Sequence, residues 1–201
     1  MTQIVKKKII ENKKNKKNKL LSAAFELFTN KGVNNTSIQE IADKAGVGKG
    51  TFYLYFKDKY DIQEYLTTEK SRELFESALK NVEGKKINDF KEKLINVIDY
   101  VIDELKEDKT TLEFIKKDLS WGVFGERVSS LIDNSKVGVL ETFKKGIKES
   151  NINIKNPELT LFLIIEMTSS VVFSSITQEK PLPIDKLKPY LYDKIRKILE
   201  D

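Results

Sequence analysis

Residues 46–56 read GVGKGTFYLYF, and this stretch decides between two folds. Its Gly-Lys-Gly-Thr core is typical of a loop that binds nucleotide phosphates, whereas its aromatic half is typical of a short helix packed on a core. The phosphate loop requires the pattern G-x-x-x-x-G-K-[ST] between a strand and a helix. With Gly48 and Lys49 as the Gly-Lys pair, Asp43 takes the position of the first glycine and Gly50 that of the hydroxyl residue. The preceding segment has a helical pattern, so the sequence argues against a nucleotide loop.

A short helix is predicted directly before this stretch. A capping box, in which two side chains satisfy backbone N–H groups at a helix start, is available as Ser37 with Glu40 or as Thr36 with Gln39. The helix is predicted to end at Gly46, because glycine adopts the turn conformation that other residues avoid. Its inward side is predicted to consist of Ile38, Ile41, Ala42 and Ala45.

A second short helix is predicted from Gly48 to about Phe56, which completes a helix-turn-helix pattern. Phe52 and Phe56 lie one turn apart and are predicted to pack on the core. A helix this short is unstable alone, so a three-helix core must hold it. Its outward side then presents an ammonium group, a bare backbone, a hydroxyl and aromatic edges, which suit DNA bases and phosphates. These groups belong to Lys49, Gly50, Thr51, Tyr53 and Tyr55.

The rest of the chain is also helical in pattern. Apolar residues recur at helical spacing and no strand-like alternation of useful length occurs, so the fold is predicted to be all-α. Residues 1–15 are polar and poorly periodic and are predicted to be a basic flexible arm or a frayed helix start. Residues 16–60 are predicted to form the three-helix domain, and residues 61–201 a larger helical domain. Its helices are expected at 58–79, 87–105, 109–118, 126–149, 158–177 and 184–199.

The amino-acid composition limits the chemistry that the chain can perform. The 201 residues include neither cysteine nor histidine, which excludes disulfides, thiol catalysis and thiolate or imidazole metal sites. An enzyme would have to use carboxylate, lysine, hydroxyl or tyrosine groups, and no such pair stands out by its spacing. The chain is predicted not to be an enzyme and to need no cofactor or metal. The alternative is carboxylate or lysine catalysis in the C-terminal domain.

Charge is unevenly distributed along the chain. Residues 1–60 contain 13 lysines and 5 acidic residues, a net charge of +8, whereas residues 61–201 carry a net charge of −3. A basic segment on a mildly acidic remainder indicates a polyanion bound at one end. The alternative is a lysine-rich segment that only keeps the protein soluble. Binding to a membrane surface is disfavoured, because the basic segment 5–19 has no continuous apolar face.

The most apolar segment, residues 159–176, approaches the length that spans a membrane. Glu166 lies near its middle, and a charged side chain at the centre of a bilayer costs about 3 kcal/mol. The segment is therefore predicted to be a buried helix, and the protein to be cytoplasmic.

Over residues 16–63 the chain resembles the DNA-binding domain of the tetracycline-repressor (TetR) family of transcriptional regulators. The resemblance rests on residues 23–62, AAFELFTNKGVNNTSIQEIADKAGVGKGTFYLYFKDKYDI. Three features occur in order, namely A-x-x-L-F with a later glycine, T-[ST]-x-x-x-I-A, and A-G-V-x-x-G-T-[FL]-Y-x-[YH]-F, and K-x-K follows. Beyond residue 63 the resemblance extends only to the layout of the family.

The resemblance implies DNA-binding roles for particular residues. Base edges in the major groove are expected to contact Lys49, Gly50 and Tyr53. Phosphates are expected to be held by Thr51, Tyr55 and Lys59, with help from Thr36 or Ser37 at the start of the preceding helix.

In the layout of this family, the last two long helices of one chain pack against the same two helices of a second chain and form a four-helix dimer interface. Independently, the helix predicted at 158–177 is apolar nearly all round, which one small domain cannot easily bury. The chain is therefore predicted to form a homodimer through 158–177 and 184–199.

The resemblance also implies a cavity for a small-molecule effector, whose binding and DNA binding weaken each other. The chain is predicted to be a ligand-responsive repressor that binds a palindromic operator as a dimer. A regulator that activates, or that does not respond to a ligand, is the alternative. The residues expected to line the cavity are Phe114, Trp121, Phe124, Phe143, Glu166 and Met167.

Overall fold

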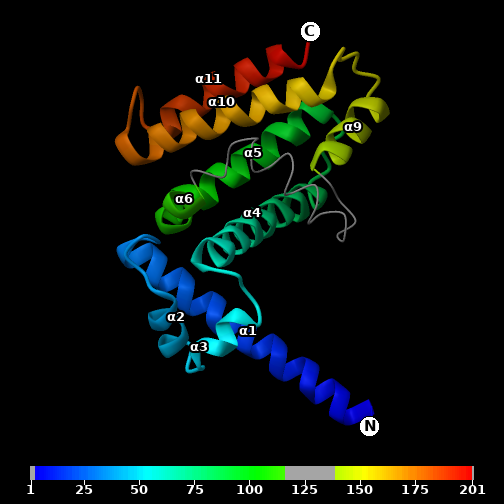
Figure 1. Cartoon of the computed structure of the whole chain (residues 1–201). Coiled ribbons are helices and arrows are strands. Elements are labelled where there is room, and N and C mark those ends of the chain that lie inside the picture. The colour runs from blue at the N-terminus through cyan, green and yellow to red at the C-terminus, as the bar shows by residue number, and fades with distance from the viewer. Residues whose placement is uncertain (1–2, 116–138, 201) are drawn as a thin grey trace. The chain divides into compact units, whose positions relative to one another are not determined.

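The computed structural model describes residues 3–115 and 139–200, with side chains from Lys6 onward, and these residues form helices joined by turns and loops (Figure 1). This confirms the predicted all-α fold. The described helices are α1 (Gln3–Lys31), α2 (Ile38–Lys44), α3 (Lys49–Tyr53), α4 (Lys59–Glu83), α5 (Phe90–Glu107), α6 (Lys109–Ile115), α9 (Val139–Glu149), α10 (Pro157–Gln178) and α11 (Ile184–Ile198).

The chain divides into two compact units, which we call the N-terminal unit (Met1–Glu69) and the C-terminal unit (Lys70–Asp201). The division falls inside α4, later along the chain than the expected boundary after residue 60. α4 is one continuous helix and therefore contributes to both units.

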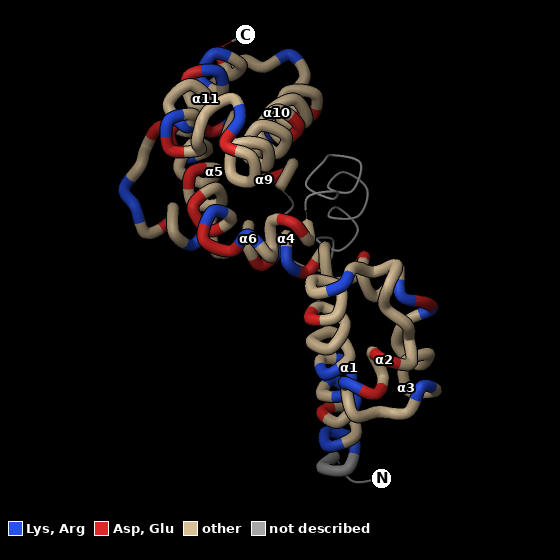
Figure 2. The backbone as a smooth tube through the Cα atoms, turned by 90° about the vertical axis from the view of Figure 1, so that its left-hand side faces the viewer, with Lys and Arg blue, Asp and Glu red and all other residues tan. Residues whose placement is uncertain are grey.

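α1 begins earlier than the sequence pattern indicates. Of the two alternatives for residues 1–15, a flexible arm or a frayed helix start, the structure has a helix, which begins at Gln3. Between Lys6 and Lys19 the side chains are exposed apart from half-buried Lys17, whose Nζ lies 3.7 Å from the centroid of the Tyr65 ring. The helix extends because lysine has a good helix propensity and adding residues to an existing helix avoids the cost of nucleation. Lysines recur along this part of α1 (Figure 2).

The helix-turn-helix of the N-terminal unit forms as predicted, with small differences. Ser37 and Glu40 make the capping box of α2, so this pair is used rather than Thr36 with Gln39. Gly46 has a φ of 65°, which glycine adopts without strain, and it makes the turn to α3. α3 ends at Tyr53, and the chain continues to Phe56 in a hydrogen-bonded turn. The core holds α1 and α3 through the buried side chains of Leu20, Ala23, Ala24, Phe28, Ile41, Ala42, Phe52 and Phe56.

The core of the C-terminal unit lies among α5, α6, α9, α10 and α11. Close packing at one point depends on Gly146 in α9. A Cβ atom at this position would lie 2.1 Å from Cε2 of Phe90, whose ring also packs on Phe143 at a centroid distance of 5.6 Å. The absence of a side chain at Gly146 therefore lets α9 approach the start of α5.

Ion pairs join α5 to α11. Arg196 binds Glu92 through two hydrogen bonds of 2.7 and 3.1 Å. Lys188 donates to Asp99 at 2.6 Å and also to Asp103, and the hydroxyl of Tyr192 donates to Asp99. Burial alone would raise the pKa of Asp99, but the hydrogen bonds from Lys188 and Tyr192 outweigh it, so its pKa is lowered. The pair of helices is thus held by charge as well as by apolar contacts.

α10 is buried on one side. It is long and apolar enough to cross a membrane, a criterion that the core helices of soluble proteins also meet, yet only 28% of its most apolar window is buried within the chain. Leu161, Ile164 and Val172 are buried, whereas Leu159 and Leu163 are 51% and 47% exposed. The predicted burial of this helix is therefore incomplete within a single chain.

Candidate functional site

The outward side of α3 and the turn after it present five of the eight residues that the sequence assigns to DNA. Lys49, Gly50 and Tyr53 are exposed, and Thr51 and Tyr55 are half-buried. Behind them Phe52 is completely buried, and its ring meets that of Tyr53 edge to face at a centroid distance of 5.6 Å. The buried phenylalanine therefore fixes the orientation of the exposed face.

A hollow of about 550 Å³ lies on the surface of the N-terminal unit, between the start of α2, α3 and the first turn of α4. It brings together donors that are far apart in the sequence. Of the residues that the sequence assigns to DNA, the hollow is lined by Thr36, Ser37, Lys49, Tyr53 and Lys59.

Of the two alternatives Thr36 and Ser37, the structure favours Ser37 as the phosphate ligand, because the side chain of Thr36 is buried. The residue is only 1% exposed, and its hydroxyl donates to the carbonyl oxygen of Gly32 at 2.8 Å. Thr36 therefore closes the turn after α1 from the inside. The other alternative, Ser37, is exposed.

Ser37 is linked to charged neighbours. The hydroxyl of Ser37 donates a hydrogen bond to Oε2 of Glu40 at 2.9 Å. It also accepts a hydrogen bond from the backbone N–H of Glu40. The hydrogen bond from Lys31, and then those from the N–H and hydroxyl of Ser37, lower the pKa of Glu40 to about 2. Glu40 therefore stays ionised at neutral pH, with the ammonium group of Lys31 beside it.

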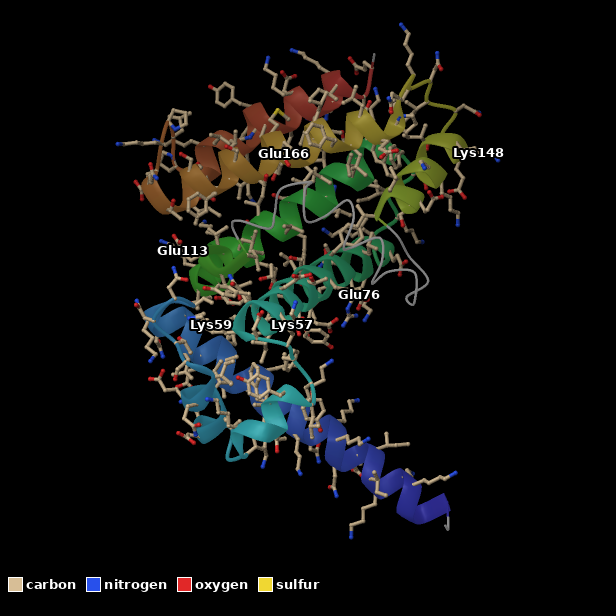
Figure 3. The ribbon with its side chains drawn as sticks, in the orientation of Figure 1. Lys57, Lys59, Glu76, Glu113, Lys148 and Glu166 are labelled. Atoms are coloured by element: carbon tan, nitrogen blue, oxygen red, sulfur yellow. The ribbon has the colours of Figure 1, made fainter. Side chains whose placement is uncertain are left out.

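Lys59 stands in the first turn of α4 and binds the loop that leads into α2 (Figure 3). Its Nζ donates to the carbonyl oxygens of Asn34 at 2.9 Å and of Thr36 at 3.1 Å. An ammonium group has three donors, so one remains after these two bonds. Lys59 thus positions the loop, a role that sequence reasoning missed.

Gly50 has no structural reason to be glycine. A Cβ atom at this position would meet nothing within 4 Å. The residue lies inside α3, where glycine is less favourable than alanine by about 1 kcal/mol. No contact in the described part of the chain offsets this loss of helix stability. We therefore expect that a binding partner approaches the backbone of α3 at Gly50.

Tyr60 lines the same hollow and was missed from the sequence. Its ring is exposed, and its hydroxyl donates to Oδ1 of Asn34 at 3.4 Å. The available signal was its position, because it directly follows the K-x-K pattern at the N-terminal end of α4.

In the C-terminal unit a partly open cavity of about 130 Å³ lies between α5 and α10. Thr168 and Ser169 supply hydroxyls to a wall that is otherwise apolar. Oγ of Ser169 donates to the carbonyl oxygen of Glu166 at 3.2 Å, whereas Oγ1 of Thr168 is buried and has no hydrogen-bond partner in the described part of the chain. The lining residues are Phe75, Leu94, Val97, Ile98, Val101, Ile102, Leu105, Val139, Leu161, Ile164, Ile165, Thr168, Ser169 and Val172.

The residues predicted to line a cavity do not line this one. Phe143 is buried against Phe90, and Phe114 and Met167 pack on the surrounding core. Glu166 lies on α10 and is half-buried (Figure 3). The prediction favoured aromatic residues, whereas the wall is mostly aliphatic. Trp121 and Phe124 lie outside the described residues.

Comparison with known proteins supports this assignment of the N-terminal unit. A family model described as "Bacterial regulatory proteins, tetR family" matches residues 20–66, which include α2 and α3. The chain is 26% identical over 171 residues to the uncharacterized HTH-type transcriptional regulator YhgD of Bacillus subtilis, covering 83% of this chain and 87% of YhgD. It is 36% identical over 89 residues to the fatty acid metabolism regulator protein of Bacillus subtilis, covering 44% of this chain and 45% of that protein.

Solved structures share the fold over most of the chain. A putative TetR-family regulator from Syntrophomonas wolfei superimposes with a TM-score of 0.67 at 21% identity, covering 94% of this chain and 96% of that one. FadR from Bacillus subtilis in complex with stearoyl-CoA has a TM-score of 0.66 at 22% identity, covering 88% and 96%. Proteins of this family are DNA-binding regulators rather than enzymes, in agreement with the prediction. Over residues 20–66 the chain contains the helix-turn-helix domain of the TetR family of transcriptional regulators.

Proposed function

We propose that the protein is a ligand-responsive repressor that binds a palindromic operator as a homodimer. The observation that carries the DNA-binding part of this proposal is the exposed face of α3, where a glycine without a structural reason stands between an exposed lysine and an exposed tyrosine. A bare backbone lets the helix approach base edges closely, and the flanking donors suit bases and phosphates. Since its partner would be bacterial DNA, we place the protein in the cytoplasm.

Within this interface each residue has a proposed role. Lys49, Gly50 and Tyr53 enter the major groove, and Thr51, Tyr55 and Ser37 hold phosphates on either side. On binding DNA, the hydroxyl of Ser37 would stop donating to Glu40 and would donate to a phosphate oxygen instead. Lys59 contributes its remaining donor while it keeps the loop before α2 in place.

The N-terminal part of α1 supports a second set of phosphate contacts. Lys6, Lys13 and Lys16 follow the three- and four-residue spacing that leads to buried Leu20, so they extend the inward side of α1 beyond the core. Glu11 is the one acidic residue among residues 1–19. We infer that this basic extension contacts the DNA backbone without reading sequence.

The exposed side of α10 supports the proposed dimer. Leu159, Leu163 and Ser170 are exposed and lie four and seven residues apart, which places them on one side of α10 along which a partner helix would pack. Two of these, Leu159 and Leu163, are large apolar side chains that are about half exposed. A twofold partner would cover them with the same surface of a second chain.

The cavity in the C-terminal unit favours a regulator that responds to a ligand over one that does not. α4 supplies Phe75 to the cavity wall and Lys59 to the hollow, so one helix takes part in both proposed sites. A ligand that shifts α4 would weaken DNA binding, and DNA would weaken ligand binding by the same factor. One relative is named as a regulator of fatty acid metabolism and one similar structure holds stearoyl-CoA, which also supports a response to a small molecule.

Fluorescence anisotropy with the DNA upstream of the gene would test the proposal. We expect tight binding that is lost on a scrambled palindrome, and that weakens steeply between about 50 and 200 mM salt. Lys49→Ala and Tyr53→Ala should reduce the preference for the palindrome over the scrambled duplex by roughly tenfold each, while circular dichroism shows an intact fold. Unchanged preference in both variants would remove α3 from the proposed interface.

A further inference from the structure

The unpaired hydroxyl of Thr168 determines what the cavity between α5 and α10 can bind. Oγ1 of this residue is buried without a hydrogen-bond partner in the described chain, although Ser169 next to it is satisfied by the carbonyl oxygen of Glu166. A buried hydroxyl without a partner destabilises the folded state. A ligand group that bonds to Thr168 would remove this cost, so the hydroxyl favours a ligand that has such a group.

The remaining wall determines the charge of the ligand. The described lining residues include no lysine, arginine, aspartate or glutamate, and all but Thr168 and Ser169 are apolar. A charged group that entered the cavity would lose its hydration without gaining an opposite charge, which is strongly unfavourable. The wall therefore selects for uncharged ligands.

The volume determines the size of the ligand. A cavity of about 130 Å³ is close to the roughly 150 Å³ of an engineered apolar cavity in another protein that accepts benzene. It therefore holds an apolar body of roughly six to eight heavy atoms. A long acyl chain exceeds this volume and would require the cavity to enlarge.

We propose that the cavity is the effector site and that it binds an uncharged amphiphile, with a ring-sized apolar body and one hydroxyl, carbonyl or amide group. Thr168 is the residue that recognises this polar group. The inference rests on the proposed ligand response and narrows its chemistry, because it disfavours free carboxylic acids at neutral pH.

Calorimetric titration of the full chain with toluene, benzyl alcohol and benzoate would test this proposal, since the three share one ring and differ in their polar group. Benzyl alcohol and toluene should bind, and benzoate should not. Thr168→Val, which replaces the hydroxyl by a methyl group of similar shape, should weaken the binding of benzyl alcohol roughly fivefold. The same variant should leave toluene binding unchanged or tighter. An equal effect on both compounds, no binding of either, or tighter binding of benzoate would overturn the proposal.

Two variants separate recognition from a change in the fold. Thr168→Ser keeps the hydroxyl and should retain the binding of benzyl alcohol relative to toluene. Thr177→Val removes a hydroxyl of α10 that bonds to the carbonyl oxygen of Phe173 and does not line the cavity, so it should not change this ratio. Thermal unfolding of Thr168→Val without ligand should occur at an equal or higher temperature, because an unsatisfied polar group is removed. A failure of the wild-type chain to bind operator DNA would contradict the proposed repressor function and leave the result for the cavity unaffected.

Discussion

At the scale of single residues, Gly50 and Gly146 show how the same residue type serves two purposes. Both are helical, but a Cβ atom would clash with Phe90 at Gly146 and would meet nothing within 4 Å at Gly50. We predict that Gly50→Ala raises the free energy of unfolding by up to about 1 kcal/mol, because alanine has the better helix propensity. The same change should weaken operator binding tenfold or more, because the added methyl group would overlap the DNA. Denaturant unfolding and fluorescence anisotropy measure the two effects.

Gly146→Ala is the matched control for Gly50→Ala. It should lower the free energy of unfolding by about 1–3 kcal/mol through overpacking against Phe90. If Gly50→Ala bound the operator as tightly as the wild type, DNA would not approach the backbone at Gly50 closely enough to require glycine.

At the scale of elements, α1 combines a buried half with a basic exposed half. We predict that changing Lys6, Lys7, Lys8, Lys13, Lys14 and Lys16 to glutamine lowers the salt dependence of operator binding. For every lysine–phosphate interaction that the variant removes, the slope of log K against log salt concentration should become shallower by about 0.9. The ratio of operator to scrambled DNA affinity should stay the same, because these interactions carry no sequence information.

The control for the α1 variant replaces lysines of the C-terminal unit by glutamine. Three exposed lysines of the C-terminal unit that lie outside the proposed dimer helices, Lys86, Lys148 and Lys155, should change the slope little when replaced by glutamine. An unchanged slope in the α1 variant would show that its lysines only keep the protein soluble.

At the scale of the whole molecule, α10 exposes apolar side chains that a second copy would cover. We predict that Leu163→Glu converts the dimer into a monomer of 23.2 kDa, because twofold symmetry places the buried carboxylate in the interface twice. Analytical ultracentrifugation measures the mass, and operator affinity should fall with it, since a palindrome requires two half-site readers.

Ile10→Glu is the control for the dimer, because Ile10 is also an exposed apolar residue but lies on α1. It should leave the mass unchanged. A wild-type chain that sediments as a monomer at micromolar concentration would contradict the proposed interface.

The sequence alone determined the features that depend on neighbours along the chain. Helical periodicity, a capping box at the start of α2, the turn at Gly46 and the buried Phe52 are local patterns, and the structure has them all, with Ser37 and Glu40 as the pair that forms the box. These patterns were enough to predict an all-α fold with a helix-turn-helix and the exposed face of α3. The sequence left a flexible arm and a helix start as alternatives for residues 1–15, because a polar segment gives no periodic signal even where an adjoining helix extends into it.

Only the tertiary structure decided the features that depend on contacts between distant segments. Burial of Thr36 and the bonds from Lys59 to the loop before α2 require α1 and α4 to be in place, and no local pattern encodes them. The position of the cavity follows from how α5 packs against α10, which periodicity does not specify. Periodicity predicts which side of a helix faces inward, whereas the fit between two helices depends on the shapes of all the side chains that meet.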